Sequence, residues 1–185
     1  MLSRLGAVTA ASESRTAPVL AELRKAIDQF ELMLLYQPKV DLQTSRIVGI
    51  EALVRWPHPE RGLLDPDEFL PMVRRSGLMG SLTDAVVNMA LDDALTFKQA
   101  AFEVPIAVNV SAPLFADARL PARIARALAD RGLTGTALSL EITEDLLFGN
   151  MEKSRDVLDQ LRRNGIRIAI DDFGSGYSTL SYLCE

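Results

Sequence analysis

The chain has 185 residues, of which 48% are hydrophobic and 24% are charged, a length and composition typical of one folded domain. The formal net charge of −5 argues against a basic face that would bind a nucleic-acid polymer. The longest stretch without a charged residue, 104–116, is shorter than the roughly 18 residues that cross a bilayer. The single cysteine, Cys184, cannot form an intrachain disulfide. We therefore expect a cytoplasmic protein without a membrane segment, in which residues 1–16 form a flexible lead-in and residues 17–185 form the domain.

Spacing of apolar residues predicts the order of the elements. Apolar residues three and four apart predict helices, whereas short apolar runs bounded by polar turns predict strands. Asp65 is expected to cap the helix that follows it, and Gly132 and Gly165 are expected to end the helices before them. The predicted elements are a helix at 17–30, a hairpin of antiparallel strands at 32–40 and 46–56, helices at 66–76 and 81–101, a strand at 106–110, a helix at 121–130, a strand at 137–142, a helix at 151–164 and a strand at 166–170.

Strands alternate with helices in the second half of the chain, which predicts right-handed crossovers and a parallel sheet. In the last three strands, large apolar residues alternate with small or polar ones. An open sheet covered by helices on both faces would be apolar on both faces. The pattern therefore predicts an α/β barrel with a polar interior or mouth. The small or polar positions are Ala107, Asn109, Ser139, Glu141, Ala169 and Asp171.

Four of the polar residues form a candidate metal site. Asn109, Glu141 and Asp171 lie at or near the carboxyl ends of successive strands, where barrel enzymes place their chemistry. Glu51 interrupts the second apolar strand in the same manner. A single polar residue at a strand end usually only satisfies hydrogen bonds. Four oxygen donors at matching depth instead favour Mg²⁺ or Mn²⁺.

Asp172 directly follows Asp171. Adjacent carboxylates at a strand end can serve two ions that share one of the carboxylates as a bridge. Such a two-metal site would suit the cleavage of a phosphodiester.

Three other side chains leave a functional and a structural interpretation open. Arg55, four residues after Glu51, can hold a phosphate bidentately or form a surface salt bridge. Gln37, which precedes a proline, can contact a base or phosphate or simply end a strand. His58, the only histidine, is expected in a turn with a structural role, because a lone histidine rarely binds metal. The sequence offers no Ser-His-Asp arrangement.

Five ordered motifs resemble those of the EAL domain, the bacterial cyclic di-GMP phosphodiesterase module, over residues 23–183. The defining triplet stands as Glu51-Ala52-Leu53. The others are Tyr36-Gln37-Pro38-Lys39-Val40, Asn109-Val110-Ser111, Glu141-Ile142-Thr143-Glu144 and the run from Asp171-Asp172-Phe173-Gly174 to Ser178.

The resemblance implies a reaction and a role for each matching residue. Metal-activated water would attack one phosphodiester of cyclic di-GMP and release linear pGpG, with Glu51, Asp171 and Asp172 as the catalytic set. The implied partners are cyclic di-GMP, a second copy of the chain in a homodimer, and sensory or GGDEF-type domains in related proteins. The implied site residues are Glu51, Asn109, Glu141 and Asp171 for the first metal, Asp171 and Asp172 for a second, Gln37, Leu53 and Arg55 for substrate, and Glu144 as anchor of the loop after the fifth strand.

The resemblance also implies an eight-stranded (β/α)8 TIM-like barrel with an antiparallel first strand. We expect about five of the eight strands, the N-terminal two-thirds of the domain, because strands carrying a catalytic lysine, a metal-binding glutamate and a glutamine would follow Asp171. Two alternatives remain. One is a non-catalytic module that binds cyclic di-GMP or a protein. The other is a different metal-dependent barrel enzyme that removes a proton beside a carboxylate.

Overall fold

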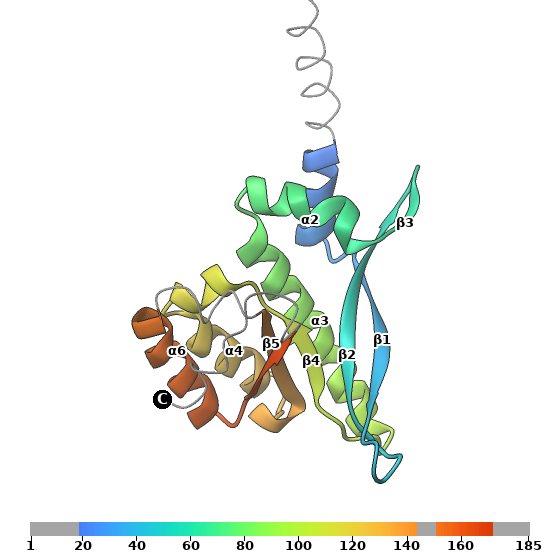
Figure 1. Ribbon diagram of the computed structural model, residues 1–185. Helices are drawn as coiled ribbons and strands as arrows, with labels where there is room; N and C mark the ends of the chain where they lie inside the picture. The colour runs from blue at the N-terminus through green and yellow to red at the C-terminus, as the bar shows by residue number, and fades with distance from the viewer. Residues whose placement is uncertain (1–18, 144–150, 172–185) are drawn as a thin grey trace, which may run out of the picture. The chain divides into compact units, whose positions relative to one another are not determined.

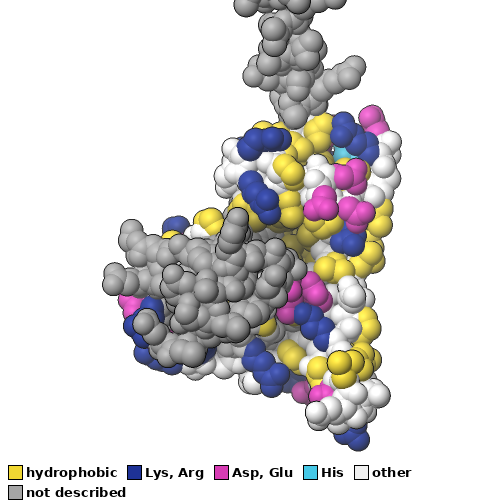
Figure 2. Space-filling view, viewed as in Figure 1, with side chains coloured by type: hydrophobic (Ala, Val, Ile, Leu, Met, Phe, Trp, Pro, Cys, Tyr) yellow, Lys and Arg dark blue, Asp and Glu magenta, His cyan; other side chains and the backbone are white. Residues whose placement is uncertain are grey.

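The computed structural model describes residues 19–143 and 151–171 (Figure 1). The expected lead-in at residues 1–16 and the cysteine at position 184 lie outside this part. Within it, no helix is long and apolar enough to cross a membrane. In the view of Figure 2, acidic and basic side chains of the described residues are intermixed rather than gathered into a basic face.

The described elements follow the predicted order, with ends that differ by a few residues. A helix covers residues 19–28. It is followed by β1 (Met33–Val40), β2 (Ile47–His58), β3 (Gly62–Leu64), α2 (Pro66–Arg75), α3 (Met79–Gln99), β4 (Ile106–Asn109), the 3₁₀ helix η1 (Ala112–Ala116), α4 (Leu120–Ala129), the 3₁₀ helix η2 (Gly135–Ala137), β5 (Leu138–Thr143), α6 (Met151–Arg163) and β6 (Arg167–Asp171).

The strands form one sheet in the order β1-β2-β4-β5-β6, with β3 paired to β2 outside this path. The pairs β2–β4, β4–β5 and β5–β6 are parallel. The turn 41–46 connects β1 to its neighbour β2, which makes this first pair an antiparallel hairpin, and the Asp41 carboxylate accepts hydrogen bonds from Gln43 and Thr44 in that turn. The predicted α/β fold with an antiparallel first strand is therefore confirmed.

The chain divides into two compact units. The sheet unit comprises residues 34–53 and the described residues from 86 onward. Its apolar strand positions are buried as predicted: Ile106, Val108, Leu138 and Leu140 are fully inaccessible to solvent. Helices α4 and α6 lie side by side in this unit, with α6 against β6 and η1 (Figure 1). Burying each such side chain stabilises the fold by about 2 kcal/mol. Because successive side chains of a strand point to opposite faces, the small and polar residues then lie on the other face of the sheet.

Two glycines set the turn that leads into β6. Gly165 adopts φ 80°, a left-handed conformation that ends α6 and that other residues adopt only at a cost. Gly135 lies against this turn so closely that a Cβ atom on it would be 2.0 Å from the carbonyl oxygen of Asn164. The close approach holds η2, and therefore the start of β5, against the turn before β6.

The second unit comprises residues 19–33 and 54–85. Its core contains Leu23, Trp56, Phe69 and Val73, each at most 2% exposed. Asp65 caps α2 as predicted, in a capping box whose reciprocal bond runs from the Asp65 N–H to Glu68 Oε2 at 3.0 Å.

His58 does not lie in an isolated turn, so this part of the sequence interpretation was wrong. It ends β2 and pairs with Gly62 of β3, a strand too short to produce a periodic pattern. The ring is buried, with Nε2 3.0 Å from Glu22 Oε2 and Nδ1 accepting a hydrogen bond from the Glu60 N–H at 3.1 Å. These contacts give His58 the structural position that the sequence predicted for it.

Candidate functional site

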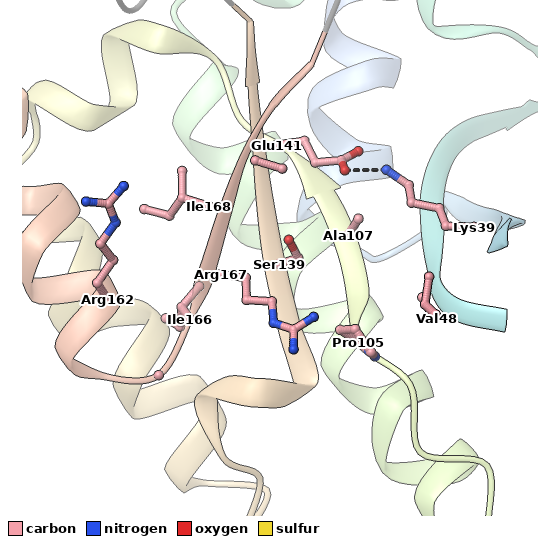
Figure 3. A pocket seen from close by; sticks show the side chains of 13 residues that line it. Lys39, Val48, Pro105, Ala107, Ser139, Glu141, Arg162, Ile166, Arg167 and Ile168 are labelled. Carbon is pink, nitrogen blue, oxygen red and sulfur yellow. Dashed lines mark hydrogen bonds and ion pairs between the residues drawn. The ribbon is translucent and has the colours of Figure 1, made fainter. Parts of the chain in front are cut away.

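Small and polar positions of β4, β5 and β6 border a cavity of about 560 Å³ in the sheet unit, which Ile166 and Ile168 also line (Figure 3). Ala107, Ser139 and Ala169 line it with short side chains, which leave the space that larger residues would fill. Glu141 also lines it, and Lys39 extends from β1 toward the Glu141 carboxylate. The alternation in the sequence therefore identified the face of the sheet that carries the site.

Three carboxylates meet at this face. Glu51 on β2, Glu141 on β5 and Asp171 on β6 each offer one oxygen atom, and these atoms all lie within 4.8 Å of one another. Asn109 on β4 borders the group, because its Nδ2 donates a hydrogen bond of 2.8 Å to Glu51 Oε1. The structure thus brings together all four residues of the predicted first metal site.

The four residues do not share one register position. Glu51 lies opposite Ala107, two residues before Asn109. Asn109 lies opposite Glu141, whereas Asp171 lies opposite Thr143, two residues beyond Glu141. The offset is two residues from β2 to β4, none from β4 to β5 and two from β5 to β6, and such an accumulating stagger is what strands tilted in a barrel wall produce. The tilt brings the carboxylates to one place although the ladder staggers them.

Lys39 neutralises part of the cluster. Its ammonium group donates a hydrogen bond to Glu141 Oε1 and lies 3.5 Å from Glu51 Oε2. Burial opposes the charged form, but the hydrogen bond and charge of Glu141 and the charge of Glu51 prevail, so the pKa of Lys39 is raised above its usual value. Lys39 was not among the predicted site residues. The signal was available, since Lys39 follows Gln37 by two residues and so shares its strand face.

One carboxylate oxygen in the cluster has no partner. The Glu141 side chain is 7% exposed, and within the described residues its Oε2 is buried without a hydrogen bond. A buried carboxylate oxygen normally finds a donor or a cation. The orphaned oxygen, together with an all-oxygen donor set, fits a hard divalent cation.

Two of the predicted substrate residues lie in the sheet unit. Gln37 is exposed on β1, and Leu53 is half-buried on β2. Arg55 lies in the other unit, where its Nε is 2.8 Å from Asp65 Oδ1 and its side chain is 18% exposed. Arg55 therefore forms the salt bridge that was one of its two interpretations. Asp172 and Glu144 lie outside the described residues.

Tyr36 anchors β1 within the sheet unit. Its hydroxyl donates a hydrogen bond to Asp93 Oδ2 on α3, and its ring makes an edge contact with Phe97. Burial, and then the hydrogen bond and charge of Asp93, raise the pKa of the Tyr36 hydroxyl above its usual value. The partner is 57 residues away in sequence, so no local pattern could have predicted this contact. It holds the strand that carries Lys39.

The family model of the EAL domain matches residues 20–185. The chain belongs to the EAL domain family. The EAL motif that gives the family its name contains Glu51, one of the clustered carboxylates. The resemblance predicted from the sequence is therefore confirmed.

Curated EAL relatives include enzymes of cyclic di-GMP metabolism. The chain is 40% identical over 163 residues to the cyclic di-GMP phosphodiesterase NbdA of Pseudomonas aeruginosa, covering 88% of this chain and 21% of NbdA. It is 39% identical over 166 residues to MucR of the same organism, a bifunctional diguanylate cyclase and cyclic di-GMP phosphodiesterase, covering 89% of this chain and 24% of MucR. The chain thus spans between a fifth and a quarter of the length of these relatives.

A solved EAL structure gives the same fold. The MucR phosphodiesterase in complex with cyclic di-GMP superposes with a TM-score of 0.82 at 38% identity, over 90% of this chain and 68% of that chain. The described sheet is therefore part of an EAL barrel, as the sequence predicted.

Proposed function

We propose that the chain hydrolyses cyclic di-GMP to linear pGpG with Mg²⁺ or Mn²⁺ held by Glu51, Asn109, Glu141 and Asp171. The observation that carries the proposal is the convergence of three carboxylates within 4.8 Å in a chain of the EAL family. Relatives named as cyclic di-GMP phosphodiesterases support the substrate.

The side chains divide the work by their chemistry. When bound, a divalent cation would lower the pKa of the attacking water and screen the charge on the phosphodiester. Glu51, Glu141 and Asp171 supply its anionic oxygens. Asn109 fixes the orientation of Glu51 through the 2.8 Å hydrogen bond, in the way that outer partners orient metal ligands. Ala107 and Ser139 keep the neighbouring face of the sheet open.

The remaining assignments follow from the family motif. We assign Asp172, with Asp171, to a second metal, and Gln37, Leu53 and Arg55 to substrate contacts. Glu144 is assigned to anchoring the loop after β6, which is the fifth strand predicted from the sequence. A homodimer through the loop 172–177 also stays a prediction, and the mass of the protein in solution tests it, because a monomeric mass would contradict it.

The experiment is a chromatographic time course of the purified chain with cyclic di-GMP and Mn²⁺, run against Asp171→Asn and Asp92→Asn. Both variants remove one negative charge, but Asp92 pairs with Arg131 on the surface of the sheet unit. We expect pGpG from the wild type and from Asp92→Asn, and none from Asp171→Asn or after chelation of the metal.

Two other results would point elsewhere. Binding of cyclic di-GMP by the folded chain without turnover would identify a receptor module. Turnover of another metal-dependent substrate, with cyclic di-GMP left intact, would indicate a different barrel enzyme. Either result would contradict the proposal.

A further inference from the structure

A lysine side chain bridges two of the clustered carboxylates. Lys39 contacts Glu141 Oε1 and Glu51 Oε2, the first through a hydrogen bond and the second across 3.5 Å. Figure 3 shows the lysine reaching from β1 toward the Glu141 carboxylate, which comes from β5, three places further along the sheet. Among the described residues, Lys39 is the cation whose ion pairs with this cluster the structure records.

The pairing resolves an electrostatic conflict. Three carboxylates whose oxygens lie within 4.8 Å repel one another strongly when no cation is near. Glu141 is nearly buried, so water screens its charge poorly. An ammonium group placed between Glu141 and Glu51 supplies part of the positive charge that the cluster requires.

The ammonium group and a divalent ion compete for the same carboxylate oxygens. Mg²⁺ binds carboxylate oxygens at about 2.0–2.1 Å and demands near-octahedral geometry. Its double charge would also repel the ammonium group across a few ångströms. The Lys39 side chain is 37% exposed and flexible, so it can leave the carboxylates without disturbing β1.

We propose that Lys39 and the divalent cation exchange at Glu51 and Glu141. Lys39 is the counter-ion of the metal-free cluster, and metal binding displaces it toward the cavity. The exchange rests on the metal site of the proposed function. It sets a threshold for metal binding, because the cation must compete with a charge already in place.

The first test uses the natural chain and follows the Lys39 amine itself. The protein is treated briefly with acetic anhydride, with chelator or with saturating Mn²⁺, and acetylation of each lysine is measured by peptide mass spectrometry. We expect acetylation of Lys39 to rise several-fold with Mn²⁺. Lys25, which pairs with Glu31 in the other unit, serves as the internal control and should not respond. Equal acetylation of Lys39 with and without bound Mn²⁺ would overturn the exchange.

The second test removes the competing charge. In Lys39→Met, which keeps an unbranched side chain, we expect Mn²⁺ to bind about tenfold more tightly than in the wild type, while the midpoint of thermal unfolding in chelator falls. Lys39→Arg should keep the weaker affinity, and Lys25→Met is the matched control. Equal or weaker Mn²⁺ binding by Lys39→Met would overturn the exchange while leaving the metal site in place. If neither wild type nor Lys39→Met bound Mn²⁺, the metal site and the exchange would fail together.

Discussion

Asn109 Nδ2 donates a hydrogen bond of 2.8 Å to Glu51 Oε1, which links β4 to β2 at the edge of the carboxylate cluster. The bond runs diagonally, because Glu51 lies opposite Ala107 in the ladder. It orients one carboxylate oxygen that can bind the metal, and it leaves Asn109 Oδ1 as a further oxygen ligand. The relationship makes Asn109 both a candidate ligand and the residue that positions another.

Replacing Asn109 should therefore weaken metal binding more than it weakens the fold. We expect Asn109→Ala to lower Mn²⁺ affinity by about 10- to 100-fold, the usual effect of losing a partner that orients a ligand. Calorimetric titration with Mn²⁺ measures the change in affinity, and urea unfolding in chelator measures the free energy of unfolding. An unchanged affinity would mean that Asn109 neither binds the metal nor positions Glu51.

Asp171→Asn should separate stability from metal binding. Removing one of three clustered charges relieves repulsion, so we expect the free energy of unfolding in chelator to rise by about 1 kcal/mol, as charge optimisation often achieves. Added Mn²⁺ should no longer raise it further. Asp92→Asn, which removes an equal charge from a side chain that is 65% exposed, should keep the metal response. A metal response in Asp171→Asn equal to that of the wild type would contradict the assignment of Asp171.

Tyr36 should make the stability of the protein fall at alkaline pH. Its folded pKa is raised by burial and by Asp93, so above the unfolded pKa of about 10 the unfolded chain releases a proton that the native chain keeps. The stability that the protonated Tyr36 hydroxyl contributes is therefore complete below about pH 10 and is lost as the pH rises above this value. Urea unfolding between about pH 8 and pH 11 should show a steeper loss for the wild type than for Tyr36→Phe. Parallel losses in the two proteins would contradict the role of Tyr36.

Gly135→Ala should disrupt the approach to β6. The new Cβ would lie 2.0 Å from the Asn164 carbonyl oxygen, which is backbone and cannot swing away. We expect a loss of about 3 kcal/mol in the free energy of unfolding, at the upper end of overpacking effects. Gly49→Ala is the matched control, since its Cβ would meet the Pro105 carbonyl oxygen at 3.3 Å, and it should cost less than about 1 kcal/mol. Equal losses would show that the close approach does not limit the turn.

The strand alternation predicted the site because a strand has a period of two. Ala107, Ser139 and Glu141 belong to the polar face whichever register the strands adopt. The register itself depends on long-range pairing. The offset of Asp171 from Glu141 by two residues therefore could not be predicted from local sequence.

Contacts between distant segments were the other features that the sequence did not reveal. The Tyr36–Asp93 bond joins a strand to a helix, and the Lys39–Glu141 contact spans 102 residues. Residue type alone favours surface positions for lysine and aspartate. The short strand β3 was not predicted, because three residues are too few to show an alternating pattern.

The most direct test of the account is a Mn²⁺ titration followed by electron paramagnetic resonance, comparing the wild-type chain with Glu141→Gln. The variant keeps the shape of a nearly buried side chain and removes only its charge and its unpartnered oxygen. The account predicts saturable binding of Mn²⁺ by the wild type and its loss, or a severe weakening, in Glu141→Gln. Equal binding by both folded proteins would show that the carboxylate cluster is not the metal centre.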